Sequence, residues 1–185
     1  MLTSVPQWVA LYTNPRAEKK VDQNLRAAGI ESYLPIRREL HNWSDRKKWV
    51  ESPLIKSYTF ARITKLQLST VRAINGVSHV VSFQGEIAVV PDNEIQMLKD
   101  FLAAEVEVQV RNIEQLKRGE RVRISSGTFA GREGMLVSDC DDGNFAVEIS
   151  GISMAMIVHI DVDLLEPLLD QPNNQVRRHK KYTIR

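Results

Sequence analysis

The sequence contains one cysteine, Cys140, and its apolar runs are only a few residues long. A single thiol excludes an internal disulfide framework. No apolar stretch of the kind found in signal peptides follows Met1, so the chain is predicted to be cytoplasmic. Its apolar runs are far shorter than the roughly 18 consecutive apolar residues of a membrane-spanning helix. The sequence therefore predicts a protein that makes no membrane contact.

The sequence also lacks the residue spacings of metal and catalytic sites. Its four histidines are scattered, and neither an H-x-x-x-H nor a C-x-x-C pattern occurs. Gly127, Gly131 and Gly134 are interpreted as turn glycines, because no Gly-Lys-Ser/Thr triplet of a phosphate-binding loop follows them. We therefore expect a protein that is not an enzyme and that holds neither a metal nor a cofactor.

The net charge of +2 averages three segments of different sign. Residues 1–100 hold 14 Lys/Arg against 10 Asp/Glu, a charge of +4. Residues 101–170 hold 6 against 13, a charge of −7, and residues 171–185 hold 5 against none, a charge of +5. This division favours two modules with different partners, of which the acidic one is poorly suited to binding phosphates.

The first hundred residues alternate between strand-like and helix-like patterns. Strands are expected where β-forming residues cluster and helices where apolar residues recur every three to four positions. The polar stretch around Arg46 is interpreted as a hairpin tip or loop. The expected strands are 8–13, 30–40 with an interruption at Pro35, 57–63, 79–83 and 87–90, and the expected helices are 16–28, 68–74 and 92–102. This order predicts an α+β domain, with one antiparallel sheet and helices packed against it.

A change of composition separates this domain from the second half of the chain. Periodicity is weak over residues 105–116, which are predicted to be a linker. Residues 117–168 contain five short strand-like segments separated by glycines, which predicts a small closed all-β barrel. The basic tail, residues 169–185, has little to bury and is predicted to be disordered.

Two groups of residues in the first domain are candidates for binding. Basic residues interleaved with Trp43 and Trp49 form a surface that favours phosphates and unstacked bases, although a solvated charged face explains the same pattern. The basic residues are Arg16, Lys19, Lys20, Arg37, Arg38, Arg46, Lys47 and Lys48. The second group is apolar and aromatic, and core packing explains about half of it. Its members are Tyr12, Pro53, Leu54, Ile55, Tyr58 and Phe60.

Four ordered motifs give the chain a specific resemblance. WVALYTNPR at 8–16, ESPLIKSYTF at 51–60 and GVSHVVSF at 76–83 resemble the N-terminal domain of NusG-family transcription factors. GERVRISSGTFAGREG at 119–134 resembles the KOW motif that opens the SH3-like C-terminal barrel of the family. The resemblance implies a polymerase-binding domain at 6–104 and a KOW domain at 117–168.

The resemblance also implies partners and site residues. In this family the N-terminal domain binds the clamp helices of the largest RNA polymerase subunit and suppresses pausing. By position, the polymerase-binding residues would be Tyr12, Pro53, Leu54, Tyr58, Phe60, Ser69 and Thr70. The residues Arg16, Lys19, Lys20, Arg37, Arg38, Trp43, Arg46, Lys47 and Lys48 would contact the non-template strand or upstream DNA. Phe129 and Arg132 in the KOW domain would contact a ribosomal protein or the termination factor Rho.

The stretch WSDRKKW at 43–49 and the Gly-Val-Ser-His segment at 76–79 are similar to specialised family members of the UpxY and RfaH types. That similarity implies a monomeric, operon-specific antitermination factor for capsular or exopolysaccharide genes. Two alternatives remain open at this point. One is a general NusG-like elongation factor, and the other is a KOW-type RNA-binding protein that does not bind polymerase.

Overall fold

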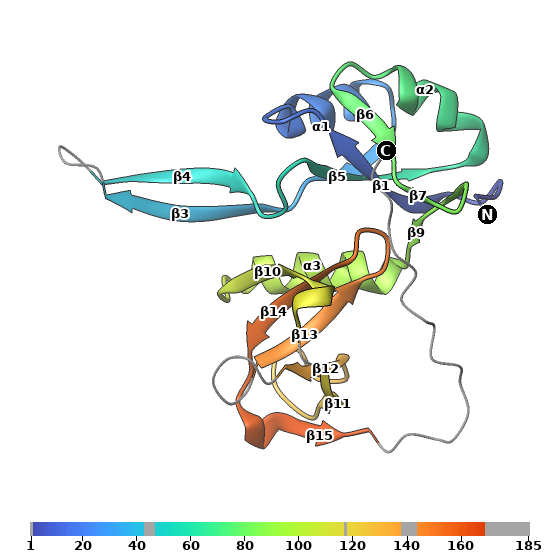
Figure 1. Cartoon of the computed structure of the whole chain (residues 1–185). Helices are drawn as coiled ribbons and strands as arrows, with labels where there is room; N and C mark the ends of the chain where they lie inside the picture. The colour runs from blue at the N-terminus through green and yellow to red at the C-terminus, as the bar shows by residue number, and fades with distance from the viewer. Residues whose placement is uncertain (1, 43–46, 117, 138–143, 169–185) are drawn as a thin grey trace. The chain divides into compact units, whose positions relative to one another are not determined.

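The computed structural model describes residues 2–42, 47–116, 118–137 and 144–168 (Figure 1). Trp43, Arg46 and the tail at 169–185, all named in the sequence-based predictions, lie outside these residues. The chain divides into two compact units. The first comprises Met1–Glu105 together with Ser150–Ile152, and the second is formed by the other residues from Val106 onward. We call them the N-terminal and C-terminal units.

The N-terminal unit combines three helices with short and medium-length strands. Its helices are α1 (Glu18–Ala27), α2 (Leu68–Ala73), which follows a 3-10 turn at Lys65–Gln67, and α3 (Asp92–Ala103). Its strands are β1 (Gln7–Thr13), β2 (Glu31–Tyr33), β3 (Ile36–Asn42), β4 (Lys47–Pro53), β5 (Tyr58–Ile63), β6 (Val77–Val80), β7 (Ser82–Phe83), β8 (Glu86–Ile87) and β9 (Val89–Val90). The observed elements are those of an α+β fold.

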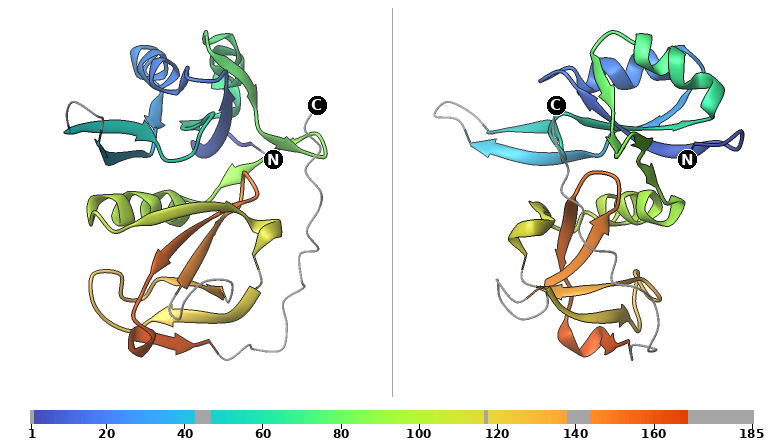
Figure 2. Two further views of the ribbon diagram at one scale, coloured as in Figure 1. Left: turned by 60° about the vertical axis from the view of Figure 1, so that its left-hand side comes forward. Right: turned by 45° about the vertical axis from the view of Figure 1, so that its right-hand side comes forward.

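A five-stranded antiparallel sheet forms the centre of this unit. Its strands follow the order β2-β5-β1-β6, and β9 also pairs with β1. Because side chains alternate between the two faces of a strand, Val9 and Leu11 of β1 lie on the same face. They pack with Val21 of α1 and Val71 of α2 in one buried cluster. Figures 1 and 2 show α1 and α2 together on this face of the sheet.

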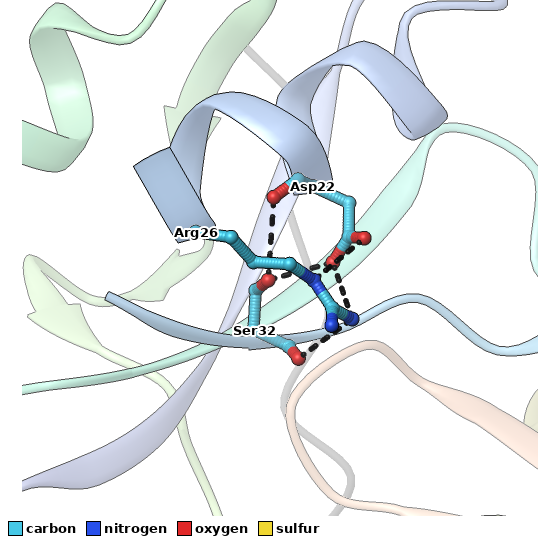
Figure 3. Close-up of polar contacts among 3 residues, drawn as sticks. All are labelled: Asp22, Arg26 and Ser32. Atoms are coloured by element: carbon cyan, nitrogen blue, oxygen red, sulfur yellow. Dashed lines mark hydrogen bonds and ion pairs between the residues drawn. The ribbon is translucent and has the colours of Figure 1, made fainter. Parts of the chain in front are cut away.

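Polar contacts fasten α1 to the neighbouring strand β2 (Figure 3). The Ser32 hydroxyl donates to Asp22 Oδ1 at 2.6 Å, and Arg26 Nε lies 3.0 Å from Asp22 Oδ2. The Arg26 guanidinium also donates to the Ser32 carbonyl oxygen at 3.4 Å. These contacts hold α1 beside the sheet. Because Arg26 takes part in them, it has a structural role in the N-terminal unit.

Strands β3 and β4 form a separate two-stranded ribbon that extends away from the central sheet (Figures 1 and 2). Their register pairs Ile36 with Pro53 at one end and Asn42 with Lys47 at the other. The sequence predicted a hairpin tip or loop around residues 46–48, whereas the structure begins a seven-residue strand at Lys47. Because β4 is rich in charged residues, its own sequence does not predict a strand. Its strand conformation is evident only from its pairing with β3.

The C-terminal unit is an antiparallel sheet of six strands in the order β10-β14-β13-β12-β11-β15. The strands are β10 (Val108–Asn112), β11 (Arg118–Ile124), β12 (Glu133–Val137), β13 (Asn144–Ile149), β14 (Met154–His159) and β15 (Leu165–Pro167), with 3-10 turns at Ile113–Gln115 and Val162–Leu164. One buried cluster of this unit joins Ile113, Val137, Ala146 and Ile157.

Two sequence-based expectations for this half differ from the structure. The segment 105–116, predicted as a linker, contains β10, whose five residues pair with β14. The predicted closed barrel is not found in the described part of the chain, where β10 and β15 stand at the two ends of the strand order. Alternation over so few residues of β10 is too short to distinguish it from an irregular segment, and strand spacing alone does not reveal whether a sheet closes.

Candidate functional site

Three rings form a row across the central sheet, and we call Tyr12, Tyr58 and His79 the aromatic row. Tyr12 on β1 is directly opposite Tyr58 on β5 and His79 on β6. The Tyr12 and Tyr58 ring centroids are 5.2 Å apart, with the rings at 79°, an edge-to-face arrangement. The Tyr12 and His79 rings are stacked, with centroids 5.1 Å apart and planes at 25°. Both geometries are favourable for aromatic pairs, and such rigid rings suit a protein-docking surface.

The aromatic row is partly open to solvent. Tyr12 and Tyr58 are half-buried and His79 is exposed. Burial, followed by the neighbouring Tyr12, raises the pKa of Tyr58. Tyr58 therefore presents a neutral ring around neutral pH.

A buried carboxylate holds the turn that precedes Tyr58. Glu18, at the start of α1, is only 6% exposed, and its Oε1 accepts a hydrogen bond from the Ser57 backbone N–H at 2.8 Å. Ser57 has a φ of 61°, in the left-handed region that non-glycine residues rarely adopt. The Ser57 carbonyl in turn accepts from the Thr13 N–H at 2.8 Å. Helix α1 thus contributes to positioning Tyr58, which follows Ser57, and Tyr12, which precedes Thr13.

The sheet face that carries Tyr12 is covered by α3 at the end near Trp8. Trp8 and Tyr12 are four residues apart on β1, so both side chains lie on the face opposite α1 and α2. Lys99 Nζ of α3 lies 5.3 Å from the Trp8 ring centroid and 5.3 Å from that of Tyr33. Cations at this distance from aromatic rings are attracted to the ring faces. This end of the face is accordingly part of the scaffold.

The environment of Tyr33 gives a test of this packing. Burial, together with the charge of Asp100, raises the pKa of Tyr33 to about 12 from 10.0. The raised pKa keeps the Tyr33 phenol protonated in the folded chain at pH values where the unfolded chain has already lost the proton. The contribution of Tyr33 to stability is therefore complete below about pH 10 and is lost as pH rises towards 12. We expect the unfolding temperature of the wild type to fall more steeply over this interval than that of Tyr33→Phe. If the unfolding temperatures of the two proteins fell equally with pH over this interval, the raised pKa could not be assigned to Tyr33.

The structure separates the predicted polymerase-binding residues. Tyr12 and Tyr58 meet in the aromatic row, Pro53 is half-buried and Leu54 is buried. Phe60 is fully buried, so it supports this face from within instead of offering a contact surface. The remaining predicted residues, Ser69 and Thr70, are exposed on α2, whose Val71 packs on the opposite face of the sheet.

His79 was not predicted to be a member of the site. Its strand was expected, and the Gly-Val-Ser-His segment was singled out as a motif. Its position beside Tyr12 depends on the register between β1 and β6, which shifts next to Tyr12. A register of this kind is set by tertiary pairing, so the local sequence carries no signal for it.

Three of the predicted basic residues lie in the first turn of α1 or just before it. Arg16, Lys19 and Lys20 are all exposed, and Arg16 has a φ of 65°. The Lys19 ammonium donates to the Glu51 carbonyl oxygen at 3.1 Å, which joins α1 to the base of the ribbon. The arrangement provides exposed cations on α1 and just before it, a suitable chemistry for a phosphate backbone.

The predicted basic residues of the ribbon are divided between its two faces. Cross-strand partners share a face, so Arg38 and Lys47 lie on one face, and Arg37 and Lys48 lie on the other. Arg38 Nε is 3.3 Å from Glu51 Oε1, on the face of Lys47. The single basic patch expected from the sequence is therefore two smaller ones.

In the C-terminal unit, the predicted partner-binding residues lie in the turn between β11 and β12. Phe129 is only 9% exposed, whereas residues 125–128 are exposed and Arg132 is half-buried. The Gly131 N–H donates to the Ile124 carbonyl at 2.7 Å, which closes the turn. Phe129 thus anchors the turn from the inside.

No group of three or more His, Cys, Asp and Glu side chains suited to holding a metal ion occurs in the ranges given above. Among the helices that the structure describes, none combines the length and hydropathy of a membrane span.

Comparison with known proteins identifies the family. No curated protein sequence matches the chain. Among solved structures, it is similar to NusG of Thermotoga maritima, with 22% identity, a TM-score of 0.51, and coverage of 89% of this chain and 98% of that one, which shows a shared fold. The MjSpt4:Spt5 complex matches with 14% identity, a TM-score of 0.29, and coverage of 89% and 99%. The family model described as transcription termination factor nusG matches residues 6–99. Because this match spans half of the chain, the chain belongs to the NusG family, whose members are transcription factors and not enzymes.

Proposed function

We propose that this protein is a transcription elongation and antitermination factor that binds RNA polymerase through the aromatic row and the neighbouring Pro53–Leu54 segment. The proposal is supported by a partly exposed row of three rings within the segment that matches the family model. The proposed partner is the pair of clamp helices of the largest polymerase subunit. A helical tip can bury such rings with little loss of side-chain entropy, as in many interface hot spots.

The exposed cations on α1 and just before it supply a second contact. We place Arg16, Lys19 and Lys20 against the non-template strand that transcription displaces. The excess of four positive charges over residues 1–100 supports this orientation towards nucleic acid. Ser69 and Thr70, on the helix of the opposite sheet face, would contact the other side of the polymerase cleft.

We propose that the C-terminal unit is an SH3-like KOW domain that recruits a second protein, either a ribosomal protein or Rho. The charge of −7 over residues 101–170 favours a protein partner over RNA. Since Phe129 is buried, the contact would be made by the exposed turn that it anchors, together with Arg132.

The capture of core RNA polymerase by the full chain tests the central proposal. Tyr58→Ala is expected to weaken binding by about 2 kcal/mol or more, which is about 30-fold, as at interface hot spots. Tyr58→Phe retains the ring and is expected to bind within a few-fold of the wild type. Circular dichroism checks that both variants are folded.

Failure of the wild type to capture polymerase, even as a paused elongation complex, would overturn the proposal. Strongly salt-dependent binding to free RNA would then favour the RNA-binding alternative. If capture succeeds, genomic occupancy separates two roles within the family. An operon-specific antiterminator of capsular or exopolysaccharide genes should occupy few transcribed genes, and a general elongation factor should occupy most of them.

A further inference from the structure

An exposed tryptophan lies on the β3–β4 ribbon. Trp49 of β4 is 62% exposed, and its cross-strand partner is Leu40. The other large hydrophobic residues found exposed in the described ranges, Val5, Leu66 and Val162, are aliphatic. Because this ring is accessible on a projecting ribbon, its face is available for stacking on a base of a bound strand.

The charges around Trp49 define what it can contact. Lys47 precedes Trp49 by two residues, so both side chains lie on the same face, roughly 6.6 Å apart along the strand. Lys47 is exposed. Towards the base of the ribbon on this face, Arg38 and Glu51 form an ion pair at 3.3 Å and so offset each other's charge. Lys48 projects from the opposite face. The face therefore offers one flat ring with a cation beside it.

We propose that Trp49 stacks on an unpaired base of single-stranded nucleic acid while Lys47 contacts a phosphate of the same strand. A ring face and an ammonium group match the two features that every nucleotide shares, the π-face of its base and its charged phosphate. In a duplex the base faces are covered by their neighbours, so this face of the ribbon selects a single strand. The inference is independent of polymerase docking, because it concerns the ribbon and the free chain can be tested.

Fluorescence anisotropy of labelled oligothymidine with the full chain tests the stacking. Trp49→Ala is expected to lower affinity about 5- to 150-fold, the range for loss of one base–aromatic stack. Trp49→Phe should restore most of this affinity. Leu66→Ala is the matched control, because it removes another exposed apolar side chain outside the ribbon and should leave binding unchanged. Melting curves establish that each variant is folded.

An abasic strand of the same length separates stacking from charge. On that strand Trp49→Ala should have no effect, because no base remains to stack. Lys47→Gln should reduce the slope of log K against log salt by about 0.7, the value for one contact with a single strand. Lys65→Gln removes an exposed cation of the 3-10 turn outside the ribbon and should keep the wild-type slope.

The proposal is overturned if Trp49→Ala binds oligothymidine as tightly as the wild type, or if it loses as much affinity on the abasic strand. Tighter binding of the duplex than of the single strand would also overturn it, as would the absence of wild-type binding. None of these results bears on polymerase capture by the aromatic row, so the two proposals fail separately.

Discussion

Gly134→Ala is expected to lower the free energy of unfolding of the C-terminal unit by about 3 kcal/mol, near the upper end of the range for overpacked cores. A Cβ at Gly134 would lie 2.6 Å from the Ala146 carbonyl oxygen and 2.6 Å from the Phe145 ring. The first neighbour is backbone within β13, and the second is a fully buried side chain. The carbonyl oxygen cannot move without disturbing the pairing of β12 with β13, and the buried ring can move only against its packed neighbours.

Urea denaturation of the full chain, combined with hydrogen exchange over β11–β14, measures this effect. Gly127→Ala is the matched control in the same unit. Gly127 has a φ of 84° but no atom within 4 Å of an added Cβ, so its cost is confined to about 1–2 kcal/mol of backbone strain. If Gly134→Ala were no more destabilising than Gly127→Ala, close packing at β12 would not be the reason for this glycine.

Glu18→Ala is expected to cost about 2–3 kcal/mol of stability, because it leaves the half-buried Ser57 N–H without its side-chain acceptor. The same change releases the left-handed Ser57 backbone, which directly precedes Tyr58. We therefore expect polymerase capture to weaken as well, even under conditions where the variant is folded.

Glu18→Gln separates the two roles of this residue, because its amide oxygen can still accept the hydrogen bond. Its loss of stability should be clearly smaller than that of Glu18→Ala, and its capture of polymerase closer to the wild type. Thermal melts and polymerase pulldown of the three proteins provide the comparison. Equal losses for alanine and glutamine would show that the hydrogen bond to Ser57 does not organise the turn.

Local patterns predicted much of the N-terminal unit. The expected strand at 8–13 and helix at 16–28 correspond to β1 and α1, because the apolar spacing of each is long and regular. Gly29, expected to end the helix in a left-handed conformation, has a φ of 71°. The expected strands at 79–83 and 87–90 are in fact four shorter pieces, β6 to β9. Short apolar runs do not show where a ladder is interrupted.

The site was less predictable than the fold, because its geometry depends on cross-strand register. The family resemblance brought Phe60 and Phe129 into the predicted contact surfaces, yet both are buried. Residue type alone grouped the cations of the ribbon, which strand alternation places on two faces. His79 was placed in the aromatic row only by the pairing of β6 with β1. Such information is non-local, so a single sequence does not contain it in readable form.

Strands β3 and β4 form a two-stranded sheet of their own. The length of this ribbon can therefore change without altering the central sheet. Seven residues of strand extend roughly 23 Å at about 3.3 Å per residue. Insertion or deletion of one cross-strand pair would lengthen or shorten this arm by one step and turn every side chain beyond it, including Trp49, to the opposite face. Only changes by two pairs preserve both the pairing and the orientation of the tip. Variation in arm length within such a ribbon is therefore expected to occur in steps of two residues per strand, without effect on the surface formed by the central sheet.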